Sequence, residues 1–198
     1  KACHSAYAPD GVNAIEYAAK LITRLGVLGE KLALRQDARF DPPYSTVQVG
    51  LITGGAALNI VPERCQFDFE IRHLPDVSLD ETLTGLQAYA NDELVQAMRA
   101  VAAEATIRFQ PLSQYPGLLS DPQSAFAGWL AQWAGNDTFS TVAFGTEGGL
   151  FDEAGVATLI CGPGSMEQGH KPDEFIALSQ LDQCLAMLDN LRHWMAAS

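Results

Sequence analysis

The residue best suited to chemistry in this sequence is His170, in a polar loop near the C-terminus. Apolar residues 156–161 precede this loop and predict a buried strand that ends at Gly162-Pro163-Gly164. Charged side chains surround the histidine between Glu167 and Glu174. A strand followed by a Gly-rich loop is a common support for a catalytic group or a metal ligand. An ordinary solvated loop histidine is the alternative that these residues leave open.

A second group of residues has the types that bind or polarise a substrate. His4 stands just before a predicted helix, and Asn59 opens an Asn-Ile-Val-Pro turn ahead of Arg72. A planar guanidinium is suited to bidentate recognition of a carboxylate. The alternative role for Arg72 is a surface ion pair with Glu70 or Asp68. The alternative for Asn59 is a plain turn residue.

A third cluster is the Gly-rich run Gly145-Thr146-Glu147-Gly148-Gly149, which offers backbone groups and one hydroxyl to a ligand. This cluster follows the apolar run 140–144, and the loop with His170 follows the apolar run 156–161. A cysteine nucleophile at Cys161, activated by His170, is a poor alternative. Cys161 belongs to an apolar run, and no third residue is evident that would orient the base.

Composition excludes several classes of function. The chain has 198 residues and a formal net charge of −12. Nucleic-acid and anionic-membrane binding both need clustered Lys and Arg, so neither partner is expected. No apolar run approaches the ~18 residues that a membrane span needs. The four cysteines show no CxxC spacing, which favours reduced thiols and a cytoplasmic location.

The elements that must position these residues follow from hydrophobic periodicity. Apolar residues at helical or alternating spacing predict a helix at 11–25, strands at 45–53 and 65–72, a helix at 79–101 and a strand at 106–109. A capping box, Ser78-Leu79-Asp80-Glu81, opens the second helix. With one strand added before Lys1, the order becomes βαββαβ, a ferredoxin-like α/β sandwich.

The second part of the chain has a different pattern. Residues 112–121 contain Pro and Gly and mark a boundary, placed between residues 113 and 114. Helices are predicted at 121–133, 148–153 and 178–195, with buried strands at 140–144 and 156–161. This order is typical of the tail of an α/β sheet.

Three phrases in the chain resemble the zinc-dependent exopeptidase and deacylase family. This family includes acetylornithine deacetylases, succinyl-diaminopimelate desuccinylases and glutamate carboxypeptidases, and the resemblance is closest to the first of these groups. The likeness covers essentially the whole chain. The phrases are Tyr7-Ala8-Pro9-Asp10-Gly11-Val12-Asn13-Ala14-Ile15-Glu16-Tyr17-Ala18, Phe40-Asp41-Pro42-Pro43-Tyr44 and Gly162-Pro163-Gly164-Ser165 with Glu167-Gln168 and His170-Lys171-Pro172-Asp173-Glu174.

The resemblance implies a fold and a missing part. Residues 1–113 would be the ferredoxin-like lid, which is also the dimerisation domain, with its first strand missing or truncated. Residues 114–198 would be the C-terminal portion of the α/β catalytic domain. The chain would then be a C-terminal fragment without most metal ligands, and it would be inactive on its own.

The resemblance also implies roles for single residues. His170 would ligate one zinc ion of a two-metal site, in which cobalt is an alternative metal. His4 would reach the partner subunit's site and polarise the scissile carbonyl. Arg72 would clamp the substrate carboxylate. Asn59, Gly145 and Thr146 would contact the substrate, and Glu147 would read its amine.

The reaction implied is the metal-dependent removal of the acetyl group from N2-acetylornithine, a step of arginine biosynthesis. The expected partners are a small-molecule N-acyl amino acid and a second copy of the chain, bound through the lid. A related deacylase or dipeptidase is the alternative within the family. A non-catalytic fragment for dimerisation and substrate binding is the alternative from another class.

Overall fold

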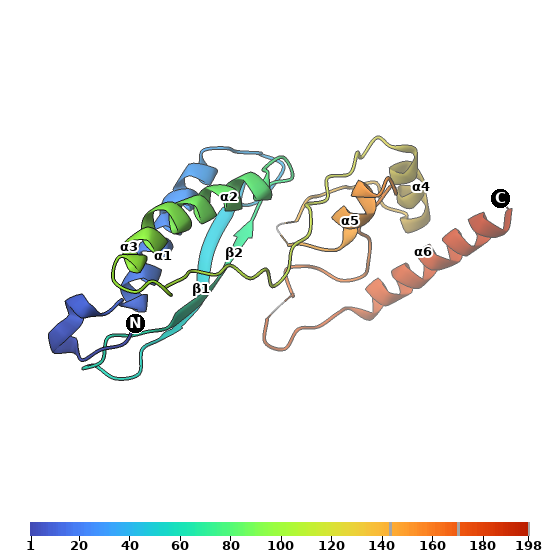
Figure 1. Ribbon diagram of the computed structural model, residues 1–198. Coiled ribbons are helices and arrows are strands. Elements are labelled where there is room, and N and C mark those ends of the chain that lie inside the picture. The colour runs from blue at the N-terminus through green and yellow to red at the C-terminus, as the bar shows by residue number, and fades with distance from the viewer. Residues whose placement is uncertain (143, 170, 198) are drawn as a thin grey trace. The chain divides into compact units, whose positions relative to one another are not determined.

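The computed structural model describes residues 1–142, 144–169 and 171–197 of the chain. It divides into two compact units, residues 1–114 with 142–144 and residues 115–141 with 145–198 (Figure 1). The main segment of the first unit ends at residue 114, next to the boundary predicted between residues 113 and 114. The assignment of the two parts to a lid and a catalytic domain stays a prediction. Each unit has its own arrangement of helices.

The first unit opens with a short 3₁₀ helix, η1 (Ser5–Asp10), followed by a long helix, α1 (Ala14–Ala33). Helix α1 begins a few residues later than the predicted range 11–25, and its N-cap is Asn13. Its Oδ1 accepts hydrogen bonds from the backbone N–H groups of Ile15 (3.1 Å) and Glu16 (3.3 Å). These bonds satisfy two of the unpaired donors at the start of the helix.

A second helical stretch runs through α2 (Leu79–Tyr89), a π-helical segment η2 (Ala90–Val95) and α3 (Gln96–Arg99). Ser78 caps it, and its hydroxyl accepts a hydrogen bond from the Glu81 N–H at 3.2 Å. The predicted N-cap is therefore confirmed. The π-helical turns fall in the middle of the stretch that the sequence predicts as one regular helix.

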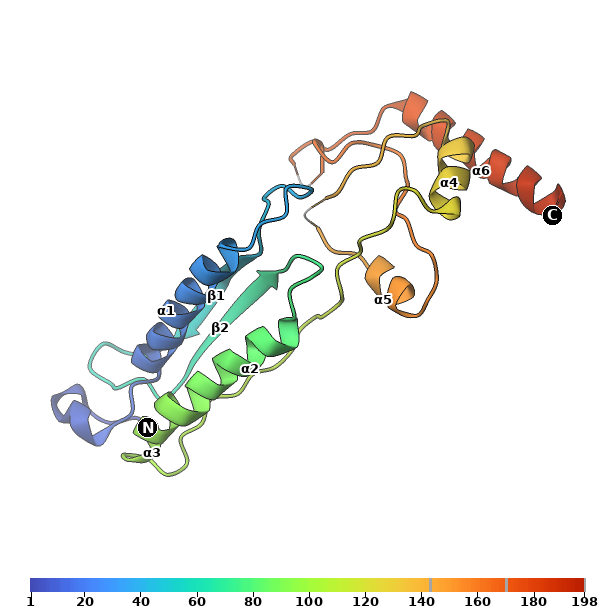
Figure 2. The same ribbon diagram turned by 90° about the horizontal axis from the view of Figure 1, so that it is seen from above.

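Two antiparallel strands, β1 (Thr46–Gly54) and β2 (Cys65–Arg72), form the sheet that the structure describes. The pairing runs from Thr46 opposite Arg72 to Gly54 opposite Cys65. The two strands therefore hold Arg72 at one end of the unit and the hairpin loop that contains Asn59 at the other (Figure 2).

A β-bulge at Gly50 interrupts the alternation of β1. Before the bulge Val49 pairs with Phe69, and after it Leu51 pairs with Asp68. The extra residue turns Leu51 to the polar side, where it is 67% exposed. The simple alternation in the sequence places Val47, Val49 and Leu51 on one face, and the bulge corrects this for Leu51.

One apolar cluster joins both helical stretches to the sheet. Its buried members come from α1 and from the α2–η2 stretch. Side chains of both strands and of the segment that follows α3 pack against them. The buried residues are Leu21, Leu25, Leu86, Ala90 and Leu94, and the partners include Val47, Val49, Phe67, Phe69, Ile107 and Phe109. Helices α1 and α2 therefore cover the same face of the sheet.

The predicted strand at 106–109 does not form. The chain after α3 runs back along the unit in an extended course (Figure 2), and Ile107 and Phe109 still reach the core. Ladder hydrogen bonds need a neighbouring strand edge in register, and the described sheet has two strands, where the βαββαβ order has four. The apolar alternation of residues 106–109 therefore predicts their partial burial correctly, but their pairing with a neighbouring strand incorrectly.

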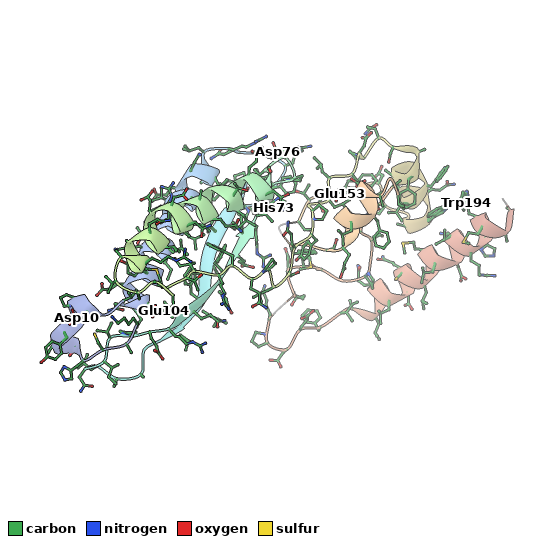
Figure 3. The ribbon with its side chains drawn as sticks, viewed as in Figure 1. Asp10, His73, Asp76, Glu104, Glu153 and Trp194 are labelled. Carbon is green, nitrogen blue, oxygen red and sulfur yellow. The ribbon has the colours of Figure 1, made fainter. Side chains whose placement is uncertain are left out.

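Among the described residues of the second unit there are three helices, α4 (Ala125–Ala134), α5 (Gly148–Glu153) and α6 (Leu178–Ala197). Helix α4 packs on α6 through three tryptophans: Trp129 and Trp133 lie 5.3 Å and 5.2 Å, ring centre to ring centre, from Trp194. Asn190 also donates a hydrogen bond of 2.9 Å to the Trp133 carbonyl. Figure 3 labels Trp194 on α6. The apolar face predicted for α6 lies largely exposed, with Leu185 63% accessible.

The two strands predicted for the second unit are wrong for the residues that the structure describes there. Residues 140–142, 144 and 156–161 have no strand pairing. Cys161, expected to be buried, is exposed. A short apolar run fits a buried strand or any other apolar segment, and only a neighbouring strand makes the difference.

The fold class is confirmed as mixed α/β with an antiparallel sheet. Within the described residues, none of the helices combines the length and the apolar character required to cross a bilayer. The first unit holds nearly all of the buried apolar residues.

This distribution of burial leads to a prediction for amide hydrogen exchange. The amides of β2 should exchange more slowly than those of residues 156–161, by at least about two orders of magnitude, because the former belong to a paired sheet over the core. Exchange of the 198-residue chain, read by mass spectrometry of peptides, measures this. Helix α6 provides an internal reference, since it is regular but little buried. Stronger protection at 156–161 than at 65–72 would contradict the described structure.

Candidate functional site

His4 lies at the start of η1 and acts as its N-cap. Its Nδ1 accepts a hydrogen bond of 3.1 Å from the backbone N–H of Ala6. A ring nitrogen that accepts uses its lone pair, so Nε2 is the ring nitrogen left to meet a ligand. The ring is exposed and stands edge-on to Tyr7, with centroids 6.3 Å apart. His4 therefore has Nδ1 engaged by the backbone and presents Nε2 on an exposed ring.

The backbone brings His4 and Asn59 together. His4 and Ile60 form an antiparallel bridge. The Ser5 N–H donates to the Asn59 carbonyl (3.0 Å), and the Val61 N–H donates to the Cys3 carbonyl (2.9 Å). Two of the predicted site residues, far apart in the sequence, thus lie on adjacent segments at one end of the first unit, with Asn59 in a turn just before the bridge.

An open pocket of about 470 Å³ lies beside these segments. Its lining comes from η1, the start of α1 and residues 54–62, and includes Ser5, Asn13 and Ile60. The polar Asn13 side chain is already used to cap α1. Burial raises the pKa of the nearby Cys65 thiol, so this cysteine stays protonated and is a poor nucleophile. The pocket offers shape and backbone groups and no titratable catalyst of its own.

Arg72 lies at the opposite end of the unit. Its Nε and Nη2 donate to the two carboxylate oxygens of Glu70, at 3.3 Å and 3.4 Å. The ion pair that the sequence left open for Arg72 is therefore present, with both side chains about half exposed. Figure 3 shows the two ends through Asp10, near His4, and His73, next to Arg72.

The length of β2 separates the two ends. Seven residue steps at ~3.3 Å give roughly 23 Å between Cys65 and Arg72. The structure thus brings His4 to Asn59 and does not bring Arg72 to either of them within one copy of the chain. No small substrate can touch both ends of one copy.

The Gly145–Thr146 cluster belongs to the second unit. The Thr146 hydroxyl accepts a hydrogen bond of 3.1 Å from the Gly148 N–H at the start of α5. Glu147, which the family resemblance assigns to recognition of the substrate amine, is exposed. Tyr115, which the sequence reasoning missed, lies directly against Gly145. The available signal was an aromatic residue followed by Pro116-Gly117 at the predicted domain boundary.

The predicted metal ligand His170 lies outside the described residues. Among the residues that are described, no three His, Cys, Asp or Glu side chains come close enough together to hold a metal ion. These side chains by themselves do not fit a catalytic zinc site, which takes three protein ligands.

Sequence comparisons identify relatives of both units. Residues 1–98 match the family model described as the peptidase dimerisation domain. The acetylornithine deacetylase of Myxococcus xanthus is 34% identical over 187 residues, which is 93% of this chain and 47% of that protein. The acetylornithine deacetylase of Aliivibrio fischeri (strain MJ11) is 32% identical over 196 residues, covering 98% of this chain and 50% of the relative. The chain spans about half the length of these curated relatives.

Solved structures support the same fold. A tripeptidase from Staphylococcus aureus superposes with a TM-score of 0.61 at 22% identity, covering 96% of this chain and 47% of the tripeptidase. An aminopeptidase from Bacillus cereus superposes with a TM-score of 0.62 at 20% identity, covering 96% of this chain and 48% of the other.

The match of the first 98 residues and the identity across nearly the whole chain agree with the motifs quoted from the sequence. They confirm the family resemblance and the presence of a dimerisation domain. Residues 1–98 thus belong to the family of peptidase dimerisation domains, and the chain is similar to acetylornithine deacetylases over nearly its whole length.

Proposed function

We propose that the protein is an amide hydrolase that removes the acetyl group from an N-acetylated amino acid, with N2-acetylornithine as the substrate. The observation that carries the proposal is the identity with acetylornithine deacetylases over nearly the full length of this chain. Arginine biosynthesis is the pathway that would use this reaction. A cytoplasmic location remains a prediction from the cysteine pattern.

His4 is proposed to stabilise the negative charge that develops on the scissile carbonyl oxygen. Its Nδ1 is engaged by the Ala6 N–H, so Nε2–H is the free donor. A pre-oriented donor costs no reorganisation when the oxyanion forms, and such donors act mainly in the transition state. Asn59, on the adjacent segment, is proposed to bind the substrate through its amide.

Arg72 is proposed to bind the substrate's α-carboxylate. The Glu70 carboxylate already lies across two of its N–H groups, which supports the view that this guanidinium is presented for bidentate recognition of a carboxylate. The Arg72–Glu70 pair is half exposed and weak. A substrate carboxylate held in a closed site therefore competes favourably with Glu70.

The separation of the two ends favours a site made by two copies. One copy would provide Arg72, and the partner would provide His4 and Asn59, joined through the dimerisation domain as a homodimer. Gly145 and Thr146 are proposed to contact the substrate from the second unit. The Thr146 hydroxyl accepts from Gly148, so its own hydrogen is available for the substrate.

Zinc, with cobalt as an alternative, is the proposed metal, and His170 is the ligand that we assign to it in this chain. A neutral imidazole nitrogen is a usual zinc ligand. A related deacylase or dipeptidase activity is the alternative within the family. For the 198-residue chain on its own, the lack of a three-ligand cluster among the described residues favours a non-catalytic role in dimerisation and substrate binding.

The first functional prediction concerns the isolated chain. Purified alone, it should bind zinc weakly and hydrolyse no N-acetylornithine, because one assigned ligand falls short of the three in catalytic zinc sites. Metal content and acetate release, measured with and without added zinc or cobalt, test this. Turnover that rises with added metal would overturn the proposed non-catalytic role of the isolated chain.

Replacing Arg72 should weaken substrate binding. In the full-length enzyme, Arg72→Ala should raise KM roughly 10- to 150-fold, since a charge-assisted hydrogen bond contributes ~1.5–3 kcal/mol. Steady-state kinetics measure this. The matched control is Arg192→Ala, which removes another exposed ion pair, with Asp189, and should leave KM unchanged.

A substrate analogue sharpens the test of Arg72. The carboxamide form of N2-acetylornithine lacks the negative charge that Arg72 is proposed to bind. It should be a poor substrate for the wild type, and Arg72→Ala should impair its hydrolysis little further. An equal loss with both substrates would assign Arg72 to structure and not to carboxylate recognition.

Replacing His4 should lower kcat. We expect His4→Ala to reduce kcat by about 100- to 1000-fold, the usual cost of one oxyanion donor. His4→Asp is the matched variant, because aspartate can still cap η1 while its carboxylate has no N–H to donate. If His4 only caps the helix, the Asp variant should regain activity; the proposal expects both variants to be impaired.

The proposal that His4 acts in the site of the partner subunit can be tested by complementation. His4→Ala subunits mixed with His170→Ala subunits should regain activity, because each heterodimer then has one complete site. Subunit exchange is verified separately with differently tagged copies. Exchange without recovery of activity would place His4 in the same subunit's site or in a structural role.

A further inference from the structure

A segment of the second unit, residues 115–118, lies directly on the Gly-rich loop 145–149. The contact is evident from how little room there is for a side chain at each glycine of the loop. A methyl group built on Gly145 would lie 2.0 Å from Cε2 of Tyr115 and 2.7 Å from its Cζ and Oη. Non-bonded carbon atoms pack at ~3.5–4.0 Å. The Tyr115 ring thus fills the place of a side chain at position 145.

The same segment closes on the loop at two more positions. A methyl group on Gly149 would lie 2.2 Å from the Pro116 carbonyl oxygen. One on Gly148 would lie 3.0 Å from Cδ2 of Leu118. Both glycines are buried. Three points of close approach therefore fix how the loop sits beneath residues 115–118.

The segment is itself restrained. Pro116 limits the backbone angles of Tyr115, because the proline ring crowds the residue before it. Beyond the segment, the Ser120 hydroxyl donates a hydrogen bond to the Thr158 carbonyl. Tyr115 as a residue remains 40% exposed, so contact with Gly145 rather than burial defines its position.

The loop's proposed substrate contacts lie between these restraints. Gly145 is held by the Tyr115 ring on one side, and Thr146 is tied to the start of α5 through the Gly148 N–H. A small shift of this loop would move the Gly145 backbone and the Thr146 hydroxyl together. Misplacement of binding groups by ~1 Å can cost about 100-fold in rate.

We propose that Tyr115 is a positioning residue that sets the place of the Gly145–Thr146 backbone against the substrate. The inference rests on the proposed role of this loop in substrate binding and adds the residue that determines its geometry. It assigns Gly145 a steric requirement: any side chain there displaces the loop from Tyr115.

Four variants of the full-length, metal-loaded enzyme test the contact. Gly145→Ala should lower kcat/KM for N2-acetylornithine by about 100-fold. Adding Tyr115→Ala to that variant removes the clashing ring and should restore at least about tenfold of the loss. Tyr115→Phe keeps the ring and should stay within about twofold of the wild type. Gly128→Ala, in an open position on α4, is the control and should leave activity unchanged.

Thermal unfolding separates positioning from folding. Tyr115→Ala alone should raise KM with little change in melting temperature, because its ring is partly exposed. The inference is wrong if Tyr115→Ala fails to rescue Gly145→Ala, or if Tyr115→Phe is as impaired as Tyr115→Ala. The melting temperatures of the Gly145→Ala and double variants read the contact without any substrate. Recovery of stability in a protein that does not hydrolyse N2-acetylornithine would support the contact and reject the proposed function.

Discussion

The packing of two helical stretches on one face of a two-stranded sheet is the interaction on which the first unit depends. Leu21 and Leu25 of α1 meet Leu86, Ala90 and Leu94 of the second stretch over the strands. This cluster fixes the direction of β1 and β2. The direction of the strands in turn sets Arg72 and the His4–Asn59 segments at opposite ends. A site that uses all of these residues therefore needs two copies of the chain.

The parts of the fold that could be predicted from sequence are those with local causes. Helical spacing of apolar residues identified the long helices, and the Ser78 cap marks its helix start through its own side chain. The alternation in residues 65–72 identified β2. The predicted strands at 106–109 and 156–161 failed because pairing depends on a neighbouring strand, which alternation within one segment cannot reveal.

The candidate site shows the same limit. The residue types of His4, Asn59 and Arg72 pointed to substrate chemistry, but their grouping depends on the hairpin and on the bridge between residues 4 and 60. Which ring nitrogen of His4 faces a ligand depends on one backbone N–H of η1. The steric role of Gly145 involves a residue thirty positions earlier, so no local pattern could indicate it.

The tryptophan contacts between α4 and α6 also have a spectroscopic consequence. All three tryptophans of the chain, Trp129, Trp133 and Trp194, belong to the second unit. Their rings lie close enough to exchange excitation energy, and their emission reports on the packing of α4 on α6. The first unit contributes no indole signal of its own, so its unfolding is followed directly through its tyrosines or its helical circular dichroism. The molecule thus carries a built-in optical label on one unit only.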